Sequence, residues 1–375
     1  MNRLVIIGNG FDLAHGLKTS YKDFIRWYLD DFFNKLINND CEFSDILLDI
    51  KGDPFKGMIF KTPEMEMMNI SVKEMYEKNL IDPFDFLNQL EEKITVEKSY
   101  FLDRILKNIE TKGWTDIESD YYALLKENAD NIDVCKNLNE QMDFLRNKLA
   151  EYLKTLTFKN RIDSIGLIFK SGIKEEDVAI SSMKRFNKEV FSYERNIYRP
   201  CGEGIVDKTI VLDFNYTDTV LNYVPLSCEN HIHGCLDNPN SMIFGYGDEM
   251  DKDFELLESR NENELLKNSK SIKYIEADNY RNLLEFIESD IFQVFIMGHS
   301  CGNSDRTLLH TIFEHENCIS IKPFYYKWGE KEGEDTYSEI TRNIYRNFKD
   351  KTLFRDRVVN KTHCDPMPQV PKATK

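Results

Sequence analysis

Several short apolar runs in this chain end abruptly in small and polar residues, and helical stretches separate them. The first run, RLVIIGNG, begins at Arg3, and TIVLDFN (209–215), IFQVFIMG (291–298) and CISIKPFYY (318–326) follow it. Continuous apolar runs of this length are typical of strands buried on both faces, as in parallel sheets. Strands that alternate with helices predict an α/β protein with a Rossmann-like, mostly parallel, doubly wound sheet.

Shorter segments and helices complete this prediction. HIHG (231–234) and MIFGYG (242–247) are expected to be two further strands. Ser20 is expected to cap a helix that runs to about Asn38, and Ser304 to cap one that ends near His315. Other helices are expected near 181–197, within 251–289 and near 336–350.

The composition changes along the chain predict four regions. Residues 1–40 would form the first strand–helix unit of the sheet domain, and 206–350 the remainder of it. The segment 41–205 between them is predicted to be a mainly helical insertion or lid. The basic, Pro-containing segment 351–375 is expected to be a disordered tail.

Charge and hydropathy exclude several classes of protein. There are 65 Asp and Glu against 49 Lys and Arg, a net charge of −16, which argues against nucleic acid as a partner. No apolar run approaches the roughly 18–20 residues of a membrane helix, and the N-terminus lacks the pattern of a secretory signal. A cytoplasmic protein with reduced thiols is therefore expected.

Four metal-ligand residue types lie close together at Cys228, His231, His233 and Cys235. Alternation along a strand would place His231, His233 and Cys235 on one face, which allows a three-ligand zinc site. Four such residues within eight positions rarely all reach one tetrahedral metal, so no metal site is assigned.

Four motifs follow predicted strands and could carry chemistry: GNGFDLAHGL (8–17), DFNYTD (213–218), HIHG (231–234) and MGHSCGNSD (297–305). Taken singly, each has an ordinary structural explanation, such as a strand-to-helix turn, a helix cap or a core histidine. Ligands bind at the carboxyl ends of strands in open α/β sheets, and all four motifs are expected there. Their common location favours a ligand site.

The chain resembles the AbiH family of bacterial abortive-infection proteins nearly from end to end. The resemblance rests on VIIGNGFDLAHGLKTSYKDF near the start, GWTDIE (113–118), FNYTDT (214–219), HIHG, FGYGD (244–248) and GHSCGNSD. It implies an antiphage effector.

The same motifs are similar, more distantly, to those of sirtuins and sirtuin-like NAD hydrolases, in the same order. Gly8, Gly10, Gly16 and Leu17 match the first glycine-rich motif of that group. The resemblance implies NAD as substrate or ligand, with Asn215 and His233 as catalytic residues. It also implies that Gly8, Gly10, Gly298 and Ser300 bind the ligand, and the neighbouring Asn9, Phe11 and Asp12 are included in the predicted binding set. Asp305 is added to this set because it could bond a ribose hydroxyl, although it could also simply favour the N-terminus of the next helix.

The chain departs from sirtuins in ways that limit this comparison. The four-cysteine zinc module after the His-Gly pair is missing, and Tyr246 replaces an acidic residue. These departures argue against protein deacylation and leave NAD binding or cleavage.

The motif GWTDIE supplies a third catalytic candidate, Glu118. On a helix, Asp116 and Glu118 would face different directions, and a helix N-terminus with acids in its first turn is an ordinary structural explanation. The resemblance to AbiH proteins implies instead that Trp114 and Glu118 enter the cleft from the insertion.

The leading hypothesis is an antiphage effector that binds NAD or a related dinucleotide and hydrolyses the nicotinamide–ribose bond. One alternative is a non-enzymatic, nucleotide-sensing protein that acts through assembly. Another is a ribonuclease toxin, since Arg357 and His363 have the R-x5-H spacing of some helical ribonucleases. A phage-derived trigger is expected, and homo-oligomerisation is left open.

Overall fold

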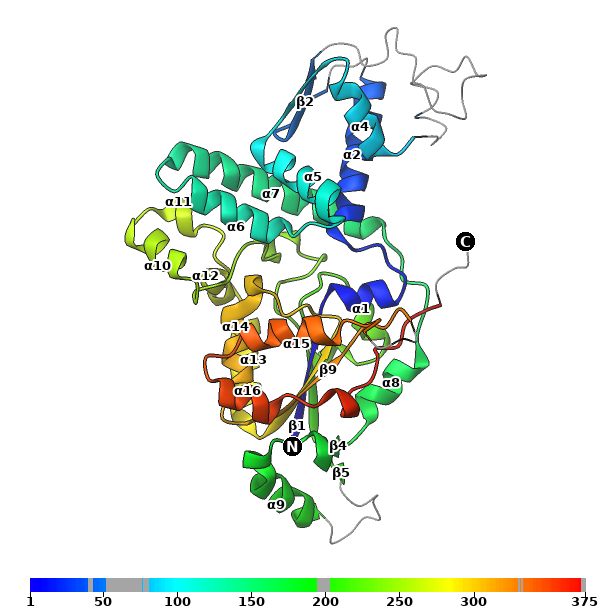
Figure 1. The fold of residues 1–375 in the computed structure, drawn as a ribbon, viewed down its shortest axis with the longest axis vertical. Coiled ribbons are helices and arrows are strands. Elements are labelled where there is room, and N and C mark those ends of the chain that lie inside the picture. Colours follow the sequence, from blue (N-terminus) through cyan, green and yellow to red (C-terminus); the bar gives the residue numbers. More distant parts are fainter. Residues whose placement is uncertain are drawn as a thin grey trace. The chain divides into compact units, whose positions relative to one another are not determined.

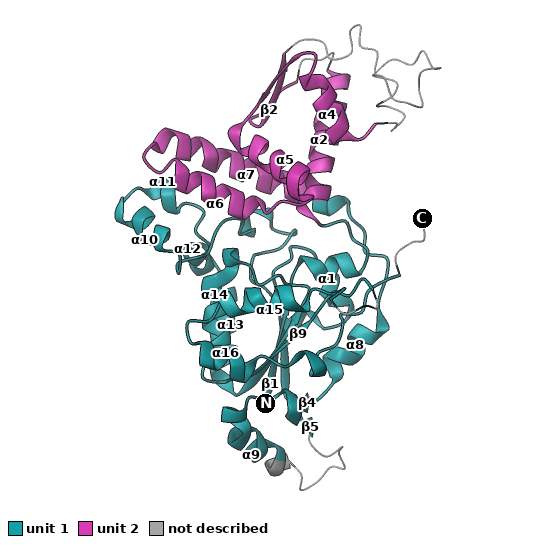
Figure 2. Cartoon of the chain, viewed as in Figure 1, with its two compact units in different colours: residues 1–19, 153–375 teal, residues 20–152 magenta. Residues whose placement is uncertain are grey.

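A computed structural model describes residues 1–39, 43–51, 76, 81–193, 203–329, 331 and 333–371. The chain forms two compact units (Figures 1 and 2). Unit 1 contains residues 1–19 and 153–375, and unit 2 contains residues 20–152. These boundaries differ from the predicted insertion of 41–205, because the first long helix belongs to unit 2 and residues 153–205 belong to unit 1.

Unit 1 is built on a five-stranded sheet, so the α/β prediction and the parallel sheet are confirmed. The strand order is β7-β6-β1-β8-β9, and each neighbouring pair is parallel. Its strands are β1 (Asn2–Ile7), β6 (Lys208–Asp213), β7 (Glu229–His231), β8 (Phe292–Met297) and β9 (Cys318–Phe324). From β1 the chain adds β6 and then β7 on one side, and it later adds β8 and then β9 on the other side of β1. The strand order therefore changes direction at β1.

Helices cover both faces of this sheet. Along β1, Leu4 and Ile6 face one core and Val5 and Ile7 face the other, because successive side chains of a strand point to opposite faces. The first core is completed by α13 (Asn279–Ser289), α14 (Arg306–Phe313) and α15 (Tyr337–Arg346), and the second by α1 (Asn9–Ala14) and α8 (Asp163–Lys170). Burial on both faces explains why these strands are apolar throughout.

Smaller elements complete unit 1. They are β4 (Ile173–Lys174), β5 (Glu203–Gly204), α9 (Met183–Tyr193), α10 (Lys252–Ser259), α11 (Asn263–Leu266), α12 (Lys270–Lys273) and α16 (Lys351–Arg357). The predicted charged helices within 251–289 are therefore confirmed.

Two of the predicted short strands are wrong in whole or in part. The segment 242–247 is a loop, in which Tyr246 makes one isolated bridge to Ser269. A Cβ on Gly245 would lie 2.0 Å from the carbonyl oxygen of Asn268, so this loop packs directly on neighbouring backbone. In the other segment, β7 ends at His231, and Gly234 has a φ of +79°. The chain therefore turns away from the sheet before His233 can continue the alternation.

Unit 2 is mainly helical. It contains α2 (Tyr21–Asn38), α4 (Pro83–Glu91), α5 (Tyr100–Lys112), α6 (Ile117–Glu127) and most of α7 (Ile132–Thr155). Strands β2 (Leu48–Lys51) and β3 (Thr95–Lys98) pair antiparallel. The predicted start of the first long helix is confirmed, since the Ser20 hydroxyl accepts a hydrogen bond from the Asp23 amide at 3.1 Å.

The expectation of a disordered tail is wrong for residues 351–371. Arg357, at the end of α16, is buried and donates to the carbonyls of Phe313 and His315, both at 2.7 Å. The amide of Val359 donates to the carbonyl of Ile321 in β9, and Val370 donates to Ala14. Hydrogen bonds to the sheet domain thus hold a segment whose composition alone is typical of disorder.

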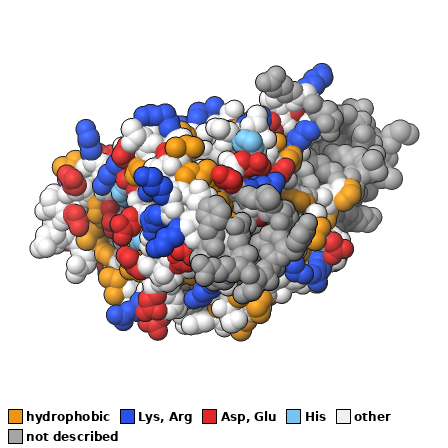
Figure 3. Space-filling view, turned by 90° about the horizontal axis from the view of Figure 1, so that it is seen from below, with side chains coloured by type: hydrophobic (Ala, Val, Ile, Leu, Met, Phe, Trp, Pro, Cys, Tyr) orange, Lys and Arg blue, Asp and Glu red, His pale blue; other side chains and the backbone are white. Residues whose placement is uncertain are grey.

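Among the described residues, no helix combines the length and apolarity that crossing a membrane requires. On the face drawn in Figure 3, acidic and basic side chains are interspersed.

Candidate functional site at the carboxyl edge of the sheet

Two glycine-containing loops meet where β1 and β8 end. The amide of Gly10 donates to the carbonyl of Gly298 at 2.8 Å. Gly298 has a φ of +76°, and a Cβ there would lie 2.1 Å from the amide nitrogen of Phe11. A Cβ on Gly8 would lie 2.8 Å from the His299 ring. The backbones therefore approach each other more closely than any side chain would permit.

Asn215 joins the loop after β6 to the loop after β1. Two hydrogen bonds hold Asn215 at the sheet edge. Its backbone N–H donates to Asp213 Oδ1 at 2.7 Å, and its side-chain Nδ2 donates to the Gly8 carbonyl at 3.1 Å. The side chain is 8% exposed. Asn215 is thus fixed beside the glycine loop, as the shared location of the motifs predicted.

A cluster of ionisable groups surrounds Asp305, which lies at the start of α14. The Lys270 ammonium is 2.8 Å from Asp305 Oδ1, and the His233 Nε2 is 3.4 Å from the same oxygen. The His299 Nε2 is 3.5 Å from Asp305 Oδ2. All four side chains are buried. This cluster brings the loops after β7 and β8 together with α12.

Burial, assisted by Lys270 and opposed by Asp305, disfavours protonation of His233. Burial lowers the pKa of His233 to about 4, and the nearby Lys270 acts in the same direction. Burial would raise the pKa of Asp305, but Lys270 and His233 outweigh it and hold that pKa below its usual range. The His233 Nε2 also lies 3.1 Å from the Tyr274 hydroxyl. A neutral imidazole beside a carboxylate can accept a proton, which is the chemistry of a general base.

His231 belongs to a different cluster, so the expected pairing of the two imidazoles on one strand face is wrong. The His231 Nε2 lies 3.2 Å from Glu229 Oε1 and 3.3 Å from Asp218 Oδ1. The His231 Nδ1 lies 4.0 Å from Asp213 Oδ2. Burial alone would lower the pKa of His231, but Glu229 and Asp213 raise it to about 10.

The four predicted zinc-type ligands therefore separate. Cys228 and Cys235 are free thiols, and His231 and His233 have different partners. Within the described residues, one group of potential ligands is compact enough for a metal ion, and it combines His231 with Asp213 and Glu229.

The remaining predicted binding residues lie in the same loops but in different environments. Phe11 packs in the second core and its amide donates to Gly8, so its side chain cannot face a ligand. Asp12 is buried and accepts a hydrogen bond from Thr217, and burial raises its pKa to about 6. Asn9 and Ser300 are exposed.

One expected cap is wrong. Ser304 lies within a short 3-10 turn (Asn303–Asp305), and Asp305 occupies the cap position of α14 without a capping hydrogen bond from its side chain. The Asp305 carboxylate is instead held by Lys270.

Sequence reasoning missed Lys270, Tyr274 and His299. His299 lies inside a motif that was recognised, next to Gly298. Lys270 and Tyr274 lie in a charged helical stretch, where nothing in the neighbouring sequence distinguishes a Lys or Tyr of the site from one on the surface.

Glu118 lies in the first turn of α6, in unit 2, and its side chain is buried. Asp116 caps this helix by accepting a hydrogen bond from the Ser119 amide at 3.2 Å, so the explanation of GWTDIE as a helix start is confirmed. Trp114 is exposed. The expected entry of Trp114 and Glu118 into the cleft stays a prediction.

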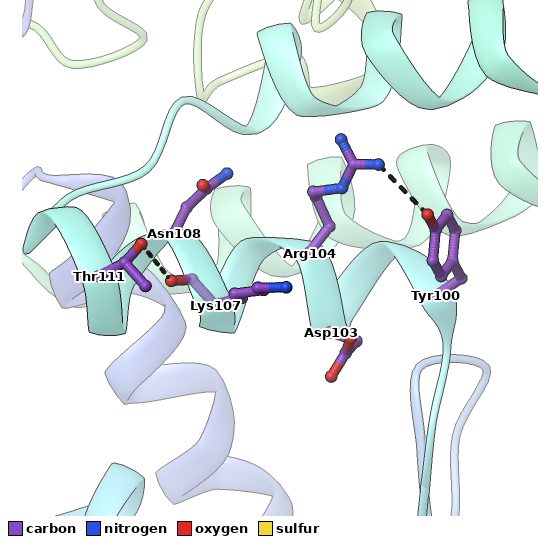
Figure 4. Close-up of a pocket in the computed structure, with 6 residues that line it drawn as sticks. All are labelled: Tyr100, Asp103, Arg104, Lys107, Asn108 and Thr111. Carbon is purple, nitrogen blue, oxygen red and sulfur yellow. Dashed lines mark hydrogen bonds between the residues drawn. The ribbon is translucent and has the colours of Figure 1, made fainter.

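Unit 2 also has a shallow hollow on one side of α5 (Figure 4). It is lined by Tyr100, Asp103, Arg104, Lys107, Asn108 and Thr111. Arg104 is paired with Glu127 at 2.8 Å. The spacing of these residues is that of one helix face, and none of the predicted site residues contributes to the hollow.

Comparison with known proteins gives one match. The model of the family described as "Bacteriophage abortive infection AbiH" matches residues 4–327. No curated protein and no solved structure matches the chain.

Proposed function

The chain belongs to the AbiH family, which implies a role in bacteriophage abortive infection, and from this premise we propose that it binds NAD or a related dinucleotide at the carboxyl edge of the sheet and hydrolyses the nicotinamide–ribose bond. The observation that carries the proposal is the convergence of Asn215, His233 and the two glycine loops at this edge. These are the motifs that resemble sirtuin-like NAD hydrolases.

The strand order supports a dinucleotide as the ligand. Numbered along the chain within the sheet, the order β7-β6-β1-β8-β9 is 3-2-1-4-5, which matches the first five strands of doubly wound dinucleotide-binding sheets. Ligands of such sheets bind where the strand order changes direction. Here that position lies between β1 and β8, where the loops of Gly8 and Gly298 meet.

The proposed reaction requires positioning, charge stabilisation and a proton acceptor. Water attacks C1′ of the ribose as the bond to nicotinamide breaks, and nicotinamide leaves with the bonding electron pair. The proton of the water passes to His233, whose neutral form is favoured by burial. Asn215 would hold the water or a ribose hydroxyl.

The two proposed catalytic side chains are largely buried, since Asn215 is 8% exposed and His233 is 5% exposed. Binding of a dinucleotide to both would therefore involve movement of the surrounding loops. Burial of both side chains in a resting state agrees with an effector that requires a phage-derived trigger, because constant hydrolysis of NAD would harm the host. The cytoplasm, where NAD is available, is the proposed location.

Release of nicotinamide by the purified full-length chain tests this proposal. The assay is run with NAD alone and with NAD plus lysate from phage-infected cells. We expect release with the trigger, and loss of at least about 100-fold in His233→Ala, in the range for removal of a general base.

His363→Ala is the matched control, because His363 lies outside the proposed site and also belongs to the ribonuclease alternative. It should release nicotinamide like the wild type. Normal turnover by a folded His233→Ala would contradict the mechanism. Tight NAD binding without release under any condition would favour the nucleotide-sensing alternative.

The ribonuclease alternative receives no support from the geometry of Arg357. Its guanidinium is buried and donates to two backbone carbonyls, which explains this residue as an anchor of the C-terminal segment. Loss of toxicity in a folded His363→Ala would revive the alternative.

A further inference from the structure

The second cluster at the sheet edge has the composition of a cation site. Asp213 is the last residue of β6, and it pairs in register with His231, the last residue of β7. Glu229 lies two residues before His231 on the same strand, so the two side chains share a strand face. One potential ligand atom from each of the three residues lies within 4.8 Å of the others.

The carboxylates of this cluster are buried without sufficient donors. Asp213 is 0% exposed, and among the described residues its Oδ2 accepts no hydrogen bond. The Glu229 side chain is 1% exposed, its Oε1 lies 3.2 Å from His231 Nε2, and no described residue donates a hydrogen bond to its Oε2. Burying a carboxylate is costly unless a cation or donors compensate it. The unused oxygens therefore indicate a positively charged ligand.

The orientation of His231 agrees with this interpretation. Its Nδ1 lies 3.1 Å from the carbonyl of Asn215, so an Nδ1–H can donate there. The other ring nitrogen, Nε2, faces Glu229 and Asp218, and it would release its proton when it coordinates a cation. In histidines that bind metals, the N–H of the second ring nitrogen commonly donates a hydrogen bond to a backbone carbonyl in this way, which fixes the tautomer and the ring orientation.

We propose that Asp213, Glu229 and His231 bind a divalent first-row transition cation, with Mn²⁺ or Zn²⁺ as the expected class. One imidazole nitrogen with carboxylate oxygens favours such ions over Mg²⁺ or Ca²⁺, which prefer oxygen ligands alone. Asp218 is 58% exposed and lies 3.3 Å from His231 Nε2, so it provides a carboxylate on the solvent side, where the cation would enter.

The cation would act as a positioning element for the neighbouring Asn215. Asp213 Oδ1 accepts the Asn215 amide, and His231 Nδ1 faces the Asn215 carbonyl. Both backbone groups of Asn215 therefore contact residues that would hold the ion. The site does not depend on NAD hydrolysis, and binding of the cation alone can be measured.

The competing arrangement is a protonated His231 that serves as the counter-ion of the carboxylates, with no metal. Titration of EDTA-treated, full-length protein with Mn²⁺ alone, followed by the electron paramagnetic resonance signal of free Mn²⁺, distinguishes the two. We expect one Mn²⁺ per chain, competition by Zn²⁺ and a higher melting temperature on binding. Absence of stoichiometric binding of either ion would overturn the proposal.

Glu229→Gln should weaken Mn²⁺ binding by about tenfold or more, as losses around metal sites commonly do. Glu288→Gln is the matched control, because Glu288 lies 3.3 Å from His315 Nε2 in a comparable His–Glu pair. It should bind Mn²⁺ like the wild type. If Glu229→Gln does not fold, the exposed Asp218→Asn serves in its place, with about threefold weaker binding expected. Unchanged affinity in the folded variants would place the ion elsewhere and contradict the proposal.

Discussion

At Gly298, the backbone geometry strongly disfavours every other residue. Its φ of +76° disfavours L-amino acids, and a Cβ would overlap with the start of α1. The contact between the β1 and β8 loops depends on this position, because the Gly298 carbonyl accepts the Gly10 amide.

We therefore expect Gly298→Ala to destabilise the fold by about 2 kcal/mol or more, since strain and overlap add. Gly302→Ala is the control, because its nearest neighbour is the Ser300 hydroxyl at 3.5 Å and its φ is negative. Urea unfolding of both variants measures the difference. Equal midpoints for the two variants would show that the close loop contact is not required.

The environment of His15, at the end of α1, predicts a pH dependence of stability. Its Nδ1 lies 2.7 Å from the Phe11 carbonyl and its Nε2 lies 2.7 Å from the Tyr223 hydroxyl. Burial lowers the pKa of His15, although the hydrogen bond to Phe11 partly opposes this effect. In the unfolded chain, His15 therefore binds a proton at a higher pH than in the folded protein.

Stability contributed by a neutral His15 should be lost as the pH falls below about 6.5, the pKa of an unperturbed histidine. The free energy of unfolding, measured with urea at pH 7 and pH 5, should fall less in His15→Gln than in the wild type. Tyr223 and Arg161, which lies over the Tyr223 ring, are the other titratable groups of this contact. An identical fall in both proteins would contradict the assignment.

Among the elements, the C-terminal helix α16 contains a buried arginine that joins it to the end of α14. The Arg357 guanidinium donates to the carbonyls of Phe313 and His315. Removal of the guanidinium would leave both carbonyls without this hydrogen-bond donor and would leave a cavity where the side chain packs.

Arg357→Ala should therefore cost about 3 kcal/mol, the scale for loss of a buried charged partner. Arg355→Ala, two residues earlier and exposed, should change stability by less than about 0.5 kcal/mol. Thermal unfolding of the two variants checks the contrast. A small effect of Arg357→Ala would mean that the segment after β9 contributes little to the domain.

The division of the whole molecule into a sheet unit and a helical unit allows regulation by the helical unit. Within the sheet unit, the surroundings of His233 favour its neutral form. A carboxylate brought to His233 by the other unit would act in the opposite direction, since a nearby negative charge stabilises the imidazolium. Glu118 is the candidate for this role.

If Glu118 blocks the site, Glu118→Gln should release nicotinamide without a trigger and be toxic in cells. Glu110→Gln, on the exposed side of α5, is the control and should remain inactive without a trigger. A Glu118→Gln variant that binds NAD but never hydrolyses it would instead make Glu118 catalytic. Behaviour like the wild type in both assays would remove Glu118 from the mechanism.

The sequence by itself determined the elements whose signals are local. Strands β1, β6, β8 and β9 are continuous apolar runs because both faces of the sheet are covered, and α2 begins at Ser20 because its hydroxyl caps the helix. The meeting of Gly8, Asn215 and Gly298 could also be predicted, because parallel strands bring their carboxyl ends to one edge.

Only the tertiary structure decided the partners of the ionisable groups. His231 and His233 are two residues apart, yet the turn at Gly234 gives them separate clusters. Lys270 reaches Asp305 from a helix 35 residues away in sequence, and a lysine in a charged stretch gives no sign of such burial. Backbone patterns arise from neighbours along the chain, whereas burial and charge pairing arise from residues that folding alone brings together.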